Sequence, residues 1–399
     1  MDRTHAVVRR IRRLGLASIS ALVLCAMLTT DVLGLTWLSD TPATKGGTGW
    51  AYPGSLAVSS SSVAHAAYEQ LVLGSWRIHY RRTTNGGATW GTPIVLSRQG
   101  IGAAGVPVID ASGSAVDAVW IEGDAIIAGT DTVVAYRRSA DSGATWLPAV
   151  RLSPLFEAAG YPHVARQGSR VVVTWTNEND GRVYVRTSND GGATFAARIA
   201  LATTTDKPFG GTILEAFPTI ALGSGVIYVG FYSASKTLKL RRSTDGGVTW
   251  KTAQTLASDA SGAWKASLAA SGSTVLAGYA RRTSSDEYSA VRRSVDKGAT
   301  FGSVVALSPA SAAYSFQPVL TYRGGFRAIY ERCATNSCST SAVYYRSSST
   351  GASWSSAVTA SVRKRSYGTP ADVDVAGKVL VMYVDANSSA GDVYIRRGG

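Results

Sequence analysis

The sequence predicts an all-β protein, a β-propeller of four-stranded antiparallel blades. One polar, glycine-containing turn with a closing aromatic residue recurs six times, and a period near fifty residues is typical of one structural unit copied in tandem. Short segments rich in Val, Tyr, Thr and Ser flank every copy, as strands do. Outside the N-terminus, no long stretch has the 3.6-residue apolar period of a helix.

The six turns share a pattern in which each position has a physical role. They are "TTNGGATW" (83–90), "SADSGATW" (139–146), "SNDGGATF" (188–195), "STDGGVTW" (243–250), "SVDKGATF" (294–301) and "SSSTGASW" (347–354). An Asp or Asn at the third position can accept hydrogen bonds from the backbone N–H groups just beyond it. The glycine at the fifth position reaches backbone angles that strain other residues. We therefore expect the third-position residues to be structural: Asn85, Asp141, Asp190, Asp245 and Asp296.

Four short strands accompany each turn, which makes one propeller blade per repeat. The segment before the turn, such as "VVAYRR" or "TLKLRR", occurs seven times, and so does the upstream strand pair. The seventh copy stops where its turn should follow, and "GLTWLSDTPAT" (34–44) resembles a worn turn and strand that could supply the missing edge. The sequence therefore favours seven blades, closed by strands from both chain ends, over the alternative of six.

The turn pattern S-x-D-x-G-x-T-W resembles the Asp-box of the sialidase (BNR repeat) superfamily, and the resemblance extends over nearly all of the chain after about residue 50. It implies a propeller whose site lies opposite the Asp-boxes, although sialidases themselves have six blades. It also implies a carboxylate clamp of three arginines, a Tyr nucleophile activated by a Glu, and an Asp general acid. The family's Arg-Ile-Pro motif is absent, because Arg77 and Ile78 are followed by His79. No catalytic residue is therefore assigned.

The first 33 residues differ from the rest of the chain. Four arginines between positions 9 and 13 precede a mostly apolar run from Leu14 to about Leu28, which is the form of a secretory signal or an N-terminal anchor. We expect residues 1–33 to be that segment and residues 34–399 to be the propeller, secreted or anchored at the extracellular face. In an exported chain, Cys333 and Cys338 are expected to form a local disulfide.

The composition limits the classes of partner. The net charge is +14, but twelve arginines belong to the repeat and would spread around the ring instead of forming one basic face. Nucleic acid is therefore not expected as a partner. Four His, without metal-ligand spacing, predict no metal site and no cofactor. We expect a monomer that contacts a membrane only through its N-terminal segment.

Any pocket is expected near the axis on the face opposite the Asp-boxes, where the innermost strands begin. Aromatic residues recur at those starts and could form a rim that stacks on sugars, plug the channel, or pack between blades. Arginines and acids lie in nearby loops. The candidate ligand-binding residues are Tyr52, Tyr161, Phe217, Trp264, Phe316, Tyr367, Arg281, Glu331, Arg332 and Arg365.

Three functions fit these features. The sequence slightly favours a non-catalytic propeller that binds a glycan or a surface protein. The alternative is an exo-acting glycoside hydrolase that resembles sialidases and acts on terminal acidic sugars, so enzymatic activity is left open. A scaffold for the assembly of exported proteins is the weaker third hypothesis.

Overall fold

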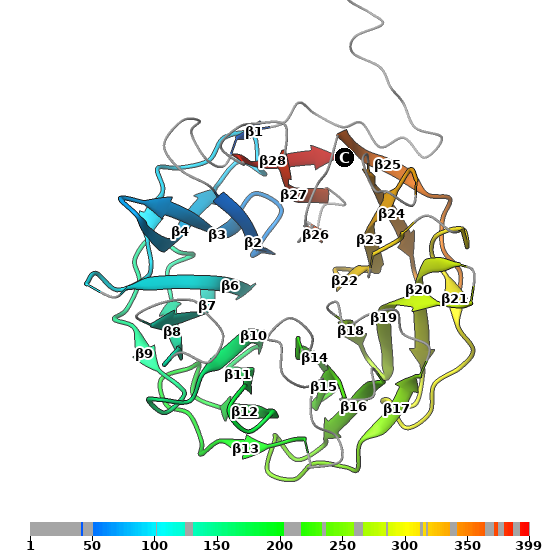
Figure 1. Ribbon diagram of the computed structural model, residues 1–399, viewed down its shortest axis with the longest axis horizontal. Coiled ribbons are helices and arrows are strands. Elements are labelled where there is room, and N and C mark those ends of the chain that lie inside the picture. The colour runs from blue at the N-terminus through cyan, green and yellow to red at the C-terminus, as the bar shows by residue number, and fades with distance from the viewer. Residues whose placement is uncertain are drawn as a thin grey trace, which may run out of the picture.

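The computed structural model of the protein is a ring of β-sheets (Figure 1). It describes residues 41–42, 51–100, 102–123, 131–202, 217–233, 237–258, 266–284, 286–311, 314–316, 318–335, 341–363, 371–373, 379–385 and 392–398. These residues form 28 strands in seven four-stranded antiparallel sheets and contain no helix. The prediction of an all-β propeller is confirmed, with the number of blades that the sequence favoured.

Six blades are each one continuous stretch of chain, and their four strands follow one another in chain order from the axis outward. Blades 1 to 3 are β2 (Ala51–Val58), β3 (Ala64–Val72), β4 (Ser75–Thr83), β5 (Ile94–Val95); β6 (Ala103–Ser112), β7 (Ala115–Gly123), β8 (Val133–Ser139), β9 (Val150–Arg151); and β10 (Ala159–Gln167), β11 (Arg170–Asn177), β12 (Arg182–Ser188), β13 (Ile199–Ala200). Blades 4 to 6 are β14 (Thr219–Gly223), β15 (Val226–Tyr232), β16 (Leu238–Ser243), β17 (Gln254–Ala257); β18 (Ser267–Ser271), β19 (Thr274–Arg282), β20 (Glu287–Ser294), β21 (Val305–Ala306); and β22 (Val319–Tyr322), β23 (Phe326–Cys333), β24 (Ser341–Ser348), β25 (Val358–Arg363).

Both ends of the chain build the seventh blade. Its inner strands are β26 (Ala371–Val373), β27 (Val379–Asp385) and β28 (Asp392–Gly398), and its outer strand is β1 (Thr41–Pro42), which pairs with β28. In the sequence, β1 begins four residues after Trp37, just as β5 begins four residues after Trp90. The ring is therefore closed as predicted, and β1 pairs with β28, which an incomplete blade would leave as a longer open edge of the kind that favours aggregation.

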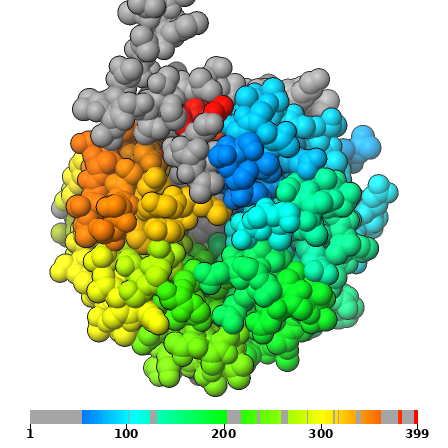
Figure 2. Space-filling model, turned by 180° about the vertical axis from the view of Figure 1, so that it is seen from behind, coloured from blue at the N-terminus to red at the C-terminus, as the bar shows by residue number. Residues whose placement is uncertain are grey.

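The core lies between the blades. The second strand of a blade is buried on both faces because neighbouring blades cover both, so β15 (VIYVGFY) is buried at every residue. Each hydrophobic cluster joins adjacent blades; one contains Val108 and Val119 of blade 2 with Val164 and Trp175 of blade 3. The space-filling view shows the blades following one another around a common centre in chain order (Figure 2).

The Asp-box turns have the hydrogen bonds that their sequence predicts. In the second turn, the Oδ1 atom of Asp141 accepts from the Ser139 hydroxyl at 2.7 Å and from the Thr145 backbone N–H at 2.8 Å, while Oδ2 accepts from the Thr145 hydroxyl at 2.6 Å. These bonds, led by that from the Thr145 side chain, lower the pKa of Asp141. Asp190, Asp245 and Asp296 make equivalent bonds within their own turns.

The sixth turn begins one residue later than the sequence pattern predicted. In blade 2, the first residue of the turn, Ser139, lies opposite Val116 of the second strand. In blade 6, the residue in the equivalent place, opposite Phe326, is Ser348 and not Ser347. Accordingly, the Gly351 N–H donates to the Ser348 hydroxyl at 2.7 Å. The turn is thus one residue shorter than the other five and contains no Asp.

The repeated arginines explain much of the positive charge by connecting blades. In blade 5, Arg292 donates to the carbonyls of Phe301 and Gly302 at the end of its own turn, and to the Leu256 carbonyl of blade 4. Its neighbour Arg293 donates to the Thr350 carbonyl in the turn of blade 6. Arginines at the same positions in blades 1 to 4 make comparable bonds to backbone carbonyls. These side chains therefore stabilise the ring.

Two further features bear on the predictions. Within the described ranges, no helix is long and apolar enough to cross a membrane. Cys333, at the end of β23, is buried and disulfide-bonded, whereas Cys338 lies outside the described residues.

Candidate functional site

A cavity of about 400 Å³ lies on the axis of the ring, lined by the innermost strands of six blades. Its volume falls within the range of small-molecule sites. Prolines within or directly before several inner strands lie toward its end away from the Asp-boxes, including Pro107, Pro162 and Pro318. A proline suits an edge strand because it has no N–H group to leave unpaired.

Strained backbone accompanies two of these prolines. Val106 and Tyr161, each directly before a proline, have φ angles of 55° and 46°. The strand register shifts at both places, between Gly105 and Val108 and between Gly160 and His163. A positive φ is unusual for a β-branched residue and occurs here at bulges, which redirect side chains at sheet edges. The bulges thus set the orientation of the residues at the mouth of the cavity.

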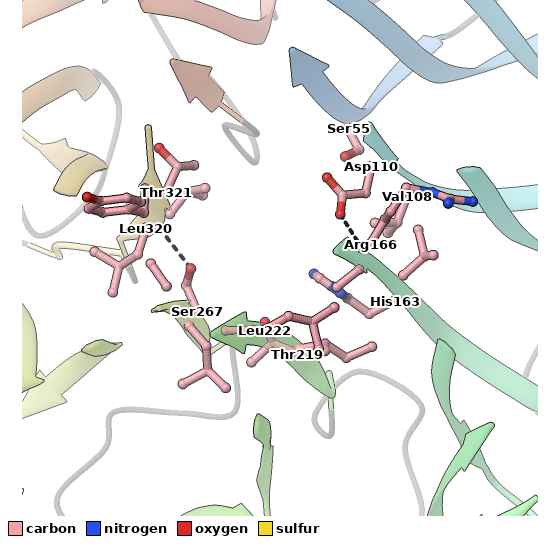
Figure 3. A pocket seen from close by; sticks show the side chains of 18 of the residues that line it. Ser55, Val108, Asp110, His163, Arg166, Thr219, Leu222, Ser267, Leu320 and Thr321 are labelled. Carbon is pink, nitrogen blue, oxygen red and sulfur yellow. Dashed lines mark hydrogen bonds between the residues drawn. The ribbon is translucent and has the colours of Figure 1, made fainter. Parts of the chain in front are cut away.

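A ring of side chains follows directly below the prolines. It consists of Ser55, Val108, His163, Thr219, Ser267 and Val319, one from each of the six lining strands. Four of these six side chains carry hydrogen-bonding groups, and they approach the axis from different sides (Figure 3). We call Ser55, His163, Thr219 and Ser267 the neck ring.

The charged groups of the cavity lie deeper, toward the Asp-boxes. The carboxylate of Asp110 accepts a hydrogen bond of 2.6 Å from the backbone N–H of Arg166. This bond pairs an N–H group on the inner strand of the next blade. The Arg166 side chain is only 4% exposed and forms an ion pair with the fully buried Asp117. Its Nη2 atom donates to Asp117 Oδ1 at 2.9 Å and to the Gly191 carbonyl at 3.0 Å. The positive charge of Arg166 is therefore neutralised inside the wall.

The structure brings two predicted aromatic residues together. The rings of Tyr161 and Phe217 meet edge to face, with centroids 4.1 Å apart, at the starts of the inner strands of blades 3 and 4. Glu178 lies beside them, because a Cβ atom on Gly160 would come within 2.8 Å of Glu178 Oε1. Burial, and then the charge of Glu178, raise the pKa of Tyr161.

The other predicted residues do not join this pair. Glu331 is buried, and Phe316 is half-buried with its N–H bonded to the Glu331 carbonyl. Arg332 donates to the Ser311 hydroxyl at 3.1 Å, and Arg281 donates to the Tyr288 hydroxyl. Tyr52 belongs to β2. Trp264, Tyr367 and Arg365 lie outside the described residues.

Three further arginines that reach this face are each paired with a carboxylate. Arg98 pairs with Glu122, Arg198 with Glu157, and Arg282 with Glu287. Trp120 and Trp175 also donate their indole N–H groups, to Glu122 at 2.9 Å and to Glu157 at 3.3 Å. Among the described residues, the arginines are thus distributed over separate blades and form no common clamp.

Glu69 is a titratable group that the sequence reasoning missed. Its Oε1 atom accepts the N–H of the strained Val106 at 2.6 Å, so it connects blade 1 to the first bulge. Burial raises the pKa of Glu69 from 4.5 to about 7, against the opposing effect of the Val106 hydrogen bond. The sequence signal for the bulge was a proline at the same place in two inner strands, in Val106-Pro107 and Tyr161-Pro162.

The raised pKa of Glu69 predicts a pH dependence of stability. A carboxyl group whose pKa is higher in the folded state contributes stability below its unfolded pKa, near 4.5, and loses it as the pH rises through about 7. Glu69→Gln keeps an oxygen for the Val106 N–H but cannot ionise. We expect the melting temperature of the wild type, relative to this variant, to fall between pH 4.5 and 8. A constant difference over that range would contradict the prediction.

No group of three or more His, Cys, Asp or Glu side chains that could hold a metal ion occurs in the described ranges. The cavity and its mouth therefore offer hydroxyl, imidazole, aromatic and carboxylate groups, together with the guanidinium groups of Arg166 and Arg323 in the lining. Such groups can bind a ligand by hydrogen bonds and stacking.

Comparison with known proteins agrees with this geometry. Residues 166–359 match the model of the BNR repeat-like domain. This part of the chain is similar to a BNR repeat-like domain. The match begins at the end of β10 and extends into β25, so it includes four of the six turns. The sequence matches no curated protein significantly.

The propeller resembles several solved structures in fold. A polysaccharide lyase of a new family, an ulvan lyase, has a TM-score of 0.52 and 11% identity over 90% of this chain and 94% of its own. A leech intramolecular trans-sialidase has a TM-score of 0.50 and 12% identity over 71% of this chain. A Hadza microbial sialidase has a TM-score of 0.46 and 16% identity over 75% of this chain. The chain spans 65% and 64% of the lengths of these two sialidases, less than two thirds.

Proposed function

We propose that this propeller binds glycan or protein ligands, without catalysing a reaction, through the face opposite the Asp-boxes. We further propose that it acts outside the cell, released or anchored by residues 1–33. The observation that carries the proposal is the aromatic pair of Tyr161 and Phe217 at the mouth of the axial cavity. Aromatic rings beside hydroxyl and carboxylate groups suit a sugar, which presents both apolar faces and hydroxyls. The polysaccharide lyase and the sialidases of similar fold act on glycans, which supports this ligand class.

The arrangement of arginines supports binding without catalysis. A bidentate clamp on a sugar carboxylate needs guanidinium groups that converge on one point. Here Arg98, Arg198 and Arg282 each bind a carboxylate of their own or the adjacent blade. Recruiting them to a ligand would leave buried carboxylates such as Glu122 and Glu157 without their partners, which is costly.

Binding to a panel of immobilised glycans, with matched aromatic variants, tests the proposal. Phe217→Ala removes one ring of the mouth, and we expect at least a tenfold loss of affinity for the glycans that the wild type binds. Tyr322→Ala is the control, because Tyr322 lines the opposite, Asp-box end of the same cavity and is exposed there. It should bind like the wild type. Binding that survives Phe217→Ala but not Tyr322→Ala would place the ligand on the other face.

An exo-acting glycoside hydrolase is the second candidate, and the position of Tyr161 beside Glu178 favours it. A tyrosine nucleophile activated by a glutamate would need this arrangement. The raised pKa of Tyr161 opposes the ionisation that such a nucleophile requires. Release of a fluorophore from a sialoside by the wild type, lost in Tyr161→Phe, would replace the binding proposal with this one.

A further inference from the structure

We propose that the neck ring holds the end of an uncharged sugar, so that the propeller selects neutral over acidic glycans. This inference rests on the proposed function and names its ligand class. The neck ring consists of Ser55, His163, Thr219 and Ser267, four side chains of four blades at one depth in the axial cavity. The juxtaposition is visible in Figure 3.

The hydrogen-bonding groups of the neck ring are those that sugar hydroxyls require. Hydroxyls and imidazole both donate and accept, so they can pair with a hydroxyl in either direction. Ser267 Oγ accepts the Leu320 N–H at 2.8 Å, a bond that does not use its own hydrogen. Ser55 Oγ donates a long hydrogen bond, 3.3 Å, to the Ile109 carbonyl. Val108 and Val319 add apolar surface at the same level, which suits the C–H face of a sugar ring.

The electrostatics of the cavity disfavour an acidic sugar. A carboxylate taken into this neck would lose its water without gaining a Lys or Arg partner, because none of the described residues of the neck ring is Lys or Arg. The nearest charge along the inner strands is the carboxylate of Asp110, two residues deeper than Val108. Beyond it, Arg166 is already bound by both oxygens of Asp117. A neutral sugar avoids this desolvation penalty.

Two Thr→Val variants in the same cavity make a matched test. Thr219→Val removes a neck-ring hydroxyl without changing the shape of the side chain. Thr321→Val makes the same change about 7 Å nearer the Asp-boxes, two residues along an inner strand. Titration calorimetry would use galactose, glucose and rhamnose as neutral probes, with glucuronic acid and N-acetylneuraminic acid as acidic probes.

We expect a neutral probe to bind, Thr219→Val to weaken it about tenfold, and Thr321→Val to leave it unchanged. Tighter binding of an acidic probe would overturn the inference while leaving glycan binding intact. Equal affinity of wild type and Thr219→Val would also overturn it, by placing the sugar elsewhere. If no probe bound, and the immobilised glycans of the previous test did not bind either, the proposed function itself would fail.

Discussion

Asp117→Asn is expected to destabilise the propeller by about 3–5 kcal/mol, because it leaves a buried guanidinium without its counter-charge. Asp117 is fully buried between blades 2 and 3, where it pairs with Arg166 and accepts the Tyr136 hydroxyl at 2.5 Å. The burial of Tyr136, followed by the charge of Asp117, raises the pKa of that tyrosine. Unfolding in urea, followed by tryptophan fluorescence, measures the loss.

A double variant tests whether the pair itself is needed. Asp117 lies in the second strand of its blade, opposite the last residue before the turn. The equivalent residues of blades 3, 5 and 7 are Val172, Leu276 and Leu380. Apolar side chains thus fill the same place elsewhere in the ring. Asp117→Leu combined with Arg166→Leu should recover most of the stability lost in Asp117→Asn. A double variant as unstable as the single one would contradict this account.

Gly143→Ala should cost about 2–4 kcal/mol because it combines backbone strain with overpacking between blades. Gly143 is the fifth residue of the second Asp-box, with φ of 74°. A Cβ atom there would overlap the Tyr80 hydroxyl of blade 1, which is held by a 2.7 Å hydrogen bond to His65. His65 is itself fully buried, so the tyrosine has little room to move.

Gly74→Ala separates the two causes. Gly74 has φ of 78°, but a Cβ atom there would meet nothing within 4 Å. It should therefore cost only the backbone strain, about 1 kcal/mol. Tyr80→Phe, added to Gly143→Ala, should relieve part of the overlap. Equal losses for the two glycine variants in urea unfolding would show that contact between blades contributes nothing.

The sequence alone determined the repeat, the turns and the closure of the ring, because each depends on short-range chemistry. The Asp, Gly and aromatic of a turn act within eight residues, so their hydrogen bonds follow from local order, as at Asp141 and Thr145. Because the unit recurs at a regular spacing, its copies form successive blades. The spacing from the closing aromatic residue of a turn to the next strand also placed "GLTW" directly before β1. The shortened sixth turn escaped this reasoning because serines at both 347 and 348 fit the pattern.

Only the tertiary structure decided what lies at the axis. The neck ring joins Ser55, His163, Thr219 and Ser267, which are up to about two hundred residues apart in the sequence. Their meeting depends on the register of each inner strand and on the bulges before Pro107 and Pro162. Whether an arginine is available or neutralised is likewise a property of its neighbours in space, as Arg166 and Asp117 show. Short-range patterns therefore specify the blades, whereas the chemistry of the centre arises from the way the blades come together.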